Sequence, residues 1–138
     1  MAETQKFGQG TSSKDLTETT ATGFVDISVA SNTSVGGNIY YTVEADDGTD
    51  FQIESGIVPF TAVNKAGTVT TNISISPSTR QSNQSVSAGT LTNNNFTATA
   101  GASKTTLNAN YTTSLTQTTL KINYRVSIEK GTATVTPL

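Results

Sequence analysis

The stretch IYYTVEADDGTDFQIESGI, residues 39–57, decides the fold class. Apolar and polar residues alternate on both sides of its centre, which is the period of a half-buried β-strand. The central Asp47-Gly48 pair is typical of a tight hairpin turn, because glycine supplies the positive φ that such a turn needs. We therefore predict a hairpin with one face in the core. The residues predicted on that face are Ile39, Tyr41, Val43, Ala45, Phe51, Ile53, Ser55 and Ile57.

The same alternation recurs along most of the chain. Its strongest example is 120–128, where Leu120, Tyr124 and Ile128 fall on one face. No segment keeps the spacing of an amphipathic helix for more than a turn. About eight short strands at this spacing predict an all-β fold, an antiparallel β-sandwich that is Ig-like or jelly-roll-like. The further strands are predicted near 25–29, 58–63, 69–75, 88–91, 96–100, 107–111 and 132–136.

Two internal features modify this pattern. Pro59 interrupts the run 58–63, and because proline cannot donate to a ladder, we expect that strand at an edge or at a bulge. Residues 76–87 are the least apolar internal stretch. We interpret them either as a long exposed loop or as a connection that crosses between the two sheets.

Composition separates the chain from a disordered tail. Apolar residues make up 33% and charged residues 13% of 138 residues, with a formal net charge of −2. Disorder requires high net charge together with low hydrophobicity. Threonine instead makes up roughly a fifth of the chain, and this β-branched residue favours strands.

The first 22 residues are polar and irregular, and the alternation begins at Phe24. We predict residues 1–22 to be a flexible or partner-ordered N-terminal arm and residues 23–138 to be the β-sandwich domain. The arm has neither the apolar run of a secretory signal nor that of a membrane span. We therefore expect a chain that is made in the cytoplasm and does not contact a membrane.

The residue types present argue against an enzyme. The chain has no Cys and no His, which excludes Ser-His-Asp and Cys-His catalysis and every thiolate metal site. A group of carboxylates around the predicted hairpin tip offers the oxygen ligands of a calcium site or the acid pair of a glycosidase. Their spacing fits ordinary turn chemistry better, so we predict no catalytic, cofactor-binding or metal-binding residues and no cofactor. These carboxylates are Glu44, Asp46, Asp47, Asp50 and Glu54.

Binding of nucleic acid or sugar finds little support. Eight basic residues against ten acidic ones provide no basic stripe for nucleic acid. Alternation places Tyr41 and Tyr124 in the core, which leaves Tyr40, and with it Tyr111, to face outward. An exposed tyrosine is typical of a protein interface. A carbohydrate-binding module that uses Tyr40 remains an alternative.

Two segments carry a resemblance to a known group of proteins. Gly36–Gly56 and Ala62–Val69 resemble stretches in small structural proteins of tailed bacteriophages, among them head-decoration proteins. The resemblance covers about a quarter of the chain and includes no functional motif. It implies a small β domain that binds the outer capsid lattice, stabilises it or displays a surface on it.

We therefore expect a non-enzymatic virion structural protein, a capsid decoration or stabilising protein located in the virion. Its partners would be major capsid or other virion subunits, and we expect it to form a homo-oligomer. The arm Met1–Thr22 and the strand around Pro59 are the segments expected to make these contacts, repeated over a lattice. The alternatives are a fibre, pilin-like or tail adhesin subunit that polymerises by strand addition, and a carbohydrate-binding receptor-recognition module.

Overall fold

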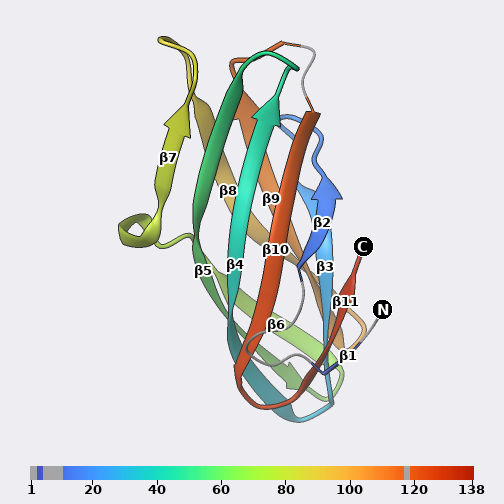
Figure 1. Cartoon of the computed structure of the whole chain (residues 1–138). Helices are drawn as coiled ribbons and strands as arrows, with labels where there is room; N and C mark the ends of the chain where they lie inside the picture. The colour runs from blue at the N-terminus through green and yellow to red at the C-terminus, as the bar shows by residue number, and fades with distance from the viewer. Residues whose placement is uncertain (1–2, 5–10, 117–118) are drawn as a thin grey trace.

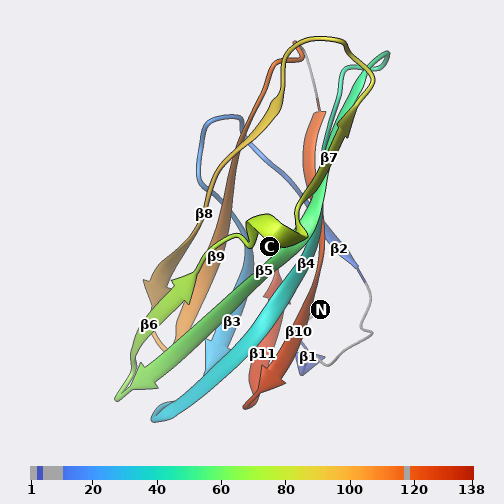
Figure 2. The same ribbon diagram turned by 90° about the vertical axis from the view of Figure 1, so that its left-hand side faces the viewer.

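Two antiparallel β-sheets lie face to face in the computed structural model, which describes residues 3–4, 11–116 and 119–138 (Figures 1 and 2). This confirms the predicted all-β sandwich. The first sheet has the order β1 (Glu3–Thr4), β11 (Ala133–Pro137), β3 (Thr22–Val29), β9 (Lys104–Thr113), β8 (Leu91–Gly101). The second has the order β2 (Ser12–Asp15), β10 (Thr119–Lys130), β4 (Thr33–Asp46), β5 (Phe51–Lys65), β6 (Thr68–Ile73), and β7 (Gln81–Gln84) also pairs with β5.

The strand order follows the immunoglobulin plan with its two terminal strands exchanged. In that plan, strands B, E and D are neighbours in one sheet, and strands F, C and C′ are neighbours in the other. Here β3, β9 and β8 occupy the first set of positions, and β10, β4 and β5 the second. The last strand, β11, lies beside β3 where strand A is expected, and the early strand β2 lies beside β10 where strand G is expected.

Aromatic rings from both sheets meet at the centre of the core. Phe24 of β3 packs edge-on against Tyr124 of β10 with 4.9 Å between ring centroids. Phe96 of β8 lies 5.0 Å from Tyr41 of β4 and 6.1 Å from Tyr111 of β9. The hydroxyl of Tyr124 donates to the carbonyl of Phe24 at 2.7 Å, so its polar end is satisfied inside the core. These contacts join the two sheets directly.

The polar stretch 76–87 belongs to the connection that crosses between the two sheets, which is one of the two alternatives predicted from the sequence. It contains the short 3₁₀ helix η1 (Pro77–Thr79) and then β7, and the chain continues to β8 in the other sheet. On their shared side of β5, β7 pairs with residues 52–55 and β6 with residues 60–65. Pro59 lies in the gap between these two pairings, where its missing N–H leaves no ladder bond unmade. The prediction of an edge or bulged strand is nevertheless wrong for residues 60–63, which pair with β4 on one side and β6 on the other.

Part of the predicted N-terminal arm belongs to the sandwich. β2 pairs with β10 over Lys121–Tyr124, and Leu16, which follows it, is buried with 8% of its surface exposed. The amide of Leu16 donates to the carbonyl of Leu120 at 2.8 Å. An apolar residue late in the segment explains why it packs on its own domain. Residues 1–2 and 5–10 of the predicted arm lie outside the described residues.

We expect Leu16→Ala to lower the free energy of unfolding by about 2 kcal/mol, because the change leaves a cavity under β2. Urea unfolding measures this value. The matched control is Ser13→Ala on the exposed side of β2, which should change stability by less than about 0.5 kcal/mol. Equal effects of the two changes would show that Leu16 does not anchor β2 to the core.

Candidate functional site

The side chains of β5 face opposite to the predicted direction. Gln52 and Glu54 are buried with 0% and 2% of their surfaces exposed, whereas Phe51 is 44% exposed. Ile53 and Ile57 are half-buried on the same outer side as Phe51. The prediction that placed Phe51, Ile53 and Ile57 in the core with β4 is therefore wrong.

The length of the connecting loop explains this correction. Asp46 pairs with Phe51, so four residues form the loop. With an even number of loop residues, every odd-numbered position of β4 lies opposite an even-numbered position of β5, on the same face of the sheet. Val43 accordingly opposes Glu54, and Ala45 opposes Gln52. A two-residue turn at Asp47-Gly48 would have the same consequence, so apolar residues of equal parity cannot share a face across this hairpin.

A signal for the true register was present further along the chain. Val58, Phe60 and Ala62 alternate as buried residues on β5, and extending their parity backwards puts Gln52 and Glu54 inside. Interpreting Pro59 as an interruption predicts two separate strands, whereas the structure shows one strand of 15 residues.

Glu54 is the centre of a buried polar cluster. Its Oε2 accepts hydrogen bonds from the hydroxyl of Tyr111 at 2.5 Å and from that of Tyr41 at 2.9 Å. The Nδ2 of Asn93 lies 3.5 Å from the same oxygen. The Nε of Arg80 approaches Oε1 at 3.7 Å from a partly exposed position. Three different strands and one connection thus satisfy a carboxylate inside the sandwich, which a buried charge requires.

Burial raises the pKa of the tyrosines around this cluster. The pKa values of both Tyr41 and Tyr111 lie well above the ordinary value of 10.0, chiefly because burial disfavours the phenolate, and the neighbouring Glu54 carboxylate adds to the effect. Burial also raises the pKa of Tyr124 to about 12. These hydroxyls therefore remain hydrogen-bond donors at neutral pH. This arrangement surrounds the Glu54 carboxylate with hydrogen-bond donors.

Gln52 forms a second buried cluster near the hairpin end of the sandwich. Its Oε1 accepts from the hydroxyl of Thr113 at 2.7 Å, and its Nε2 donates to Ser114 at 2.8 Å and to Gln84 at 3.1 Å. These partners come from β9, from the residue after β9 and from β7, so Gln52 ties the two sheets together. Both polar atoms of its amide side chain, Oε1 and Nε2, therefore have hydrogen-bond partners within the protein.

Because the odd-numbered residues of β5 face outward, several apolar side chains form a row on the surface. We call this row the outer stripe, and it consists of Phe51, Ile53, Ile57 and Val63. Val63 is 51% exposed and Phe51 44%, and these are two of the three large apolar side chains with high exposure in the described residues. The stripe runs along the outer face of the second sheet from one end of β5 to the other. Exposed apolar rows of this kind mark sites of association with other proteins.

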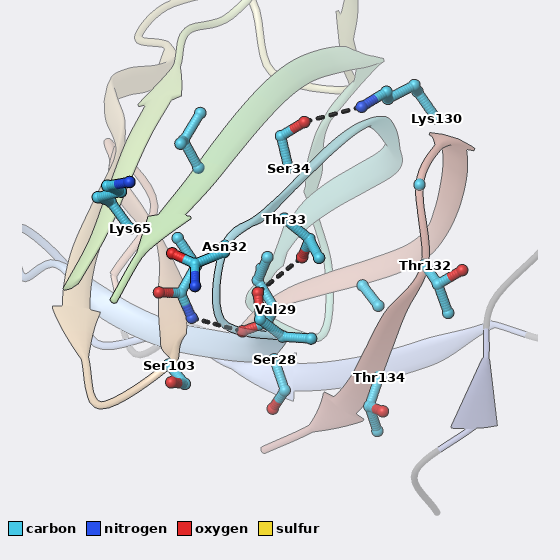
Figure 3. A pocket seen from close by; sticks show the side chains of 15 residues that line it. Ser28, Val29, Asn32, Thr33, Ser34, Lys65, Ser103, Lys130, Thr132 and Thr134 are labelled. Atoms are coloured by element: carbon cyan, nitrogen blue, oxygen red, sulfur yellow. Dashed lines mark hydrogen bonds between the residues drawn. The ribbon is translucent and has the colours of Figure 1, made fainter. Parts of the chain in front are cut away.

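The second surface feature is a hollow of about 1030 Å³ at the end of the sandwich where β5 and β10 finish. Figure 3 shows Lys65 and Lys130 on opposite sides of it. The remaining lining is mostly polar or small, with hydroxyls such as Ser28 and Thr132, and it includes the apolar Val29 and Val63. None of the described lining residues is acidic. We call this feature the lysine hollow.

Hydrogen bonds hold the loops around the lysine hollow in place. Asn64, buried at the end of β5, donates to the carbonyl of Val29 at 2.7 Å and accepts from the amide of Gly67 at 2.8 Å. Asn32 accepts from the amide of Ala66 at 3.1 Å. Asn32, Ala66 and Ser103 have φ values of 62°, 52° and 53°, respectively, so three residues at this end have a left-handed, strained backbone conformation. Such strain gathers at functional sites.

The carboxylates at the hairpin tip have structural roles. Asp47 accepts from the amides of Thr49 and Asp50 at 2.9 and 2.7 Å, and these bonds lower the pKa of its carboxyl below the ordinary value. Asp46 accepts from the amide of Gly48 at 2.7 Å. Glu54 is buried away from the tip. Within the described residues, no three acidic side chains come together as a metal site.

The division of the tyrosines into buried and exposed residues differs in part from the sequence prediction. Tyr41 and Tyr124 are buried as predicted, but Tyr111 is also buried, with 0% exposed, and faces Glu54. Its parity with Leu107 and Ala109 was the signal for this position. Tyr40 lies on the outer face, where the guanidinium of Arg125 stacks over its ring at 4.4 Å. One face of the Tyr40 ring is therefore covered.

Comparisons with known proteins add no identity. No family model matches the chain, and neither a curated protein nor a solved structure resembles it significantly. No helix among the described residues is long and apolar enough to span a membrane.

We expect Glu54→Ala to lower the free energy of unfolding by about 3 kcal/mol, because it leaves two buried tyrosine hydroxyls and Arg80 without their acceptor. Chemical denaturation at neutral pH measures the loss. Glu44→Ala, a carboxylate removed from the outer side of neighbouring β4, is the matched control and should cost less than about 1 kcal/mol. Similar losses in both variants would contradict the assigned role of Glu54.

The raised tyrosine pKa values predict a loss of stability at alkaline pH. Below pH 10 the tyrosines are protonated in both states, and their contribution is fully present. Above pH 10 the unfolded chain ionises first, so stability falls by up to about 1.4 kcal/mol per pH unit for each buried tyrosine until its folded pKa is reached. Tyr111→Phe should make this decline shallower. Urea titrations between about pH 9 and pH 11.5 test it, and parallel profiles of variant and wild type would contradict it.

Proposed function

We propose that this chain is a non-enzymatic structural protein that binds other protein subunits. The observation that carries this proposal is the inversion of β5, which places Gln52 and Glu54 inside and the apolar outer stripe outside. A chain in which only 33% of the residues are apolar needs most of them for its core. Their exposure in one row is explained if a partner covers them.

The partner that we propose is a neighbouring subunit of a repeating assembly, with a capsid or another virion protein as the leading case. The resemblance of Gly36–Gly56 to phage structural proteins supports this case, and that segment includes the loop and the start of the stripe. A decoration protein would use the stripe as its docking row, and many weak contacts would add over the lattice. In this proposal the protein is located in the virion.

A fibre or tail adhesin subunit is the second candidate. It is favoured by the different character of the two ends of the sandwich, the lysine hollow at one and three aspartates at the other. A carbohydrate-binding module based on Tyr40 has less support, because Arg125 covers one face of the ring that would stack on a sugar.

Immunogold electron microscopy on lysate of the source, with an antibody raised to this chain, tests the location. Regular label over phage heads is the expected result. Label along filaments or at cell surfaces would favour the fibre subunit and overturn the decoration role.

Binding to purified particles tests the docking row. We expect Phe51→Ser with Val63→Ser to weaken co-sedimentation with the particles about tenfold or more, because both exposed apolar anchors are lost. Thr61→Ala, an exposed change on the same face of β5, should leave binding unchanged. Undiminished binding of the double variant, with an unaltered melting temperature, would refute the outer stripe as the contact surface.

A further inference from the structure

The two ends of the sandwich are chemically complementary. β4 and β5 run its whole length, roughly 45 Å for a strand of 14 residues. At one end the turn between them carries Asp46, Asp47 and Asp50, which we call the acidic turn. At the other end lies the lysine hollow, with Lys65 and Lys130. Figure 1 shows the β4–β5 turn and the start of β4 at opposite ends of the molecule.

Each end also holds one of the exposed apolar side chains. Phe51 directly follows the acidic turn and is 44% exposed, and Val63, which is 51% exposed, lines the lysine hollow. Both ends therefore combine charge with an apolar anchor, and the charges have opposite sign. An apolar anchor flanked by complementary charges is the pattern of a specific protein contact.

We propose that the acidic turn of one copy docks into the lysine hollow of a second copy, with Phe51 of the first packing on Val63 of the second. The contact is head-to-tail, so repetition gives a ring if the rotation closes and a filament if it does not. This inference rests on the proposed function, because it names a second copy of the chain as one of the subunits bound.

The geometry of both surfaces favours docking without rearrangement. The aspartates are held by hydrogen bonds to the backbone of their own turn and, for Asp50, to the hydroxyl of Ser85 at 2.9 Å. The loops of the hollow are fixed through Asn32 and Asn64. Lys130 donates to Ser34 at 2.8 Å at the rim. Glu129 beside it is engaged by the hydroxyl of Ser127 and is not part of the lining. Two preorganised surfaces lose little conformational entropy on association.

A mixing experiment tests the contact with two complementary variants. The first, Lys65→Glu with Lys130→Glu, keeps the acidic turn and loses the hollow. The second replaces Asp46, Asp47 and Asp50 by Asn, which keeps the turn's hydrogen-bond acceptors and removes the charges. We expect the wild type to form oligomers in sedimentation velocity runs. We expect each variant alone to associate about tenfold or more weakly, and the mixture to form a dimer and nothing larger.

The control is Asn95→Glu with Asn123→Glu, which adds two negative charges at exposed positions inside β8 and β10, away from both ends, and should oligomerise like the wild type. Melting temperatures near that of the wild type establish that all variants fold. A wild type that stays monomeric up to about 1 mM, or a mixture that stays monomeric, would overturn the proposal. If that happens while Phe51→Ser with Val63→Ser still weakens particle binding, only the head-to-tail contact is wrong. If that double variant has no effect either, the proposed function falls too.

Discussion

The four-residue loop between Asp46 and Phe51 fixes which side chains of β5 face the core, and the rest of the molecule is arranged around that constraint. β4 presents Ile39, Tyr41 and Val43 inward, so an even loop assigns the even-numbered residues of β5 to the same side. Gln52 and Glu54 are thereby placed between the sheets. The apolar residues next to them are turned outward in the same step, because adjacent strand residues point to opposite faces.

A carboxylate and an amide inside a sandwich are tolerated only when their hydrogen bonds are complete. The opposite sheet meets this demand for Glu54 through Tyr111 and Asn93, and for Gln52 through Thr113. The two sheets are consequently joined by directional bonds as well as by aromatic packing. This specificity allows a core with few apolar residues to hold one register, and it leaves the apolar outer stripe available for association.

Sequence alternation predicted the sandwich, the hairpin position and the buried rings of Tyr41 and Tyr124. It failed on β5 because the parity of the loop, and not the local apolar alternation, decides which residues of that strand face the core. It failed on Tyr111, whose equal parity with Leu107 and Ala109 indicates a core position. The lysine hollow could not be predicted from the sequence, because its lining comes from loops far apart in the chain, such as those at Asn32, Lys65 and Ser103. Only the strand order brings these loops together.

The exchange of the terminal strands has a consequence for how the chain folds. β2 completes the edge of β10, and the Tyr124 hydroxyl binds the carbonyl of Phe24 a hundred positions earlier. β11 in turn pairs with β3. Neither sheet has its full set of strands until β10 and β11 have joined strands from the first part of the chain. A domain closed by such distant pairings folds slowly, because closing long loops costs entropy before the distant contacts form.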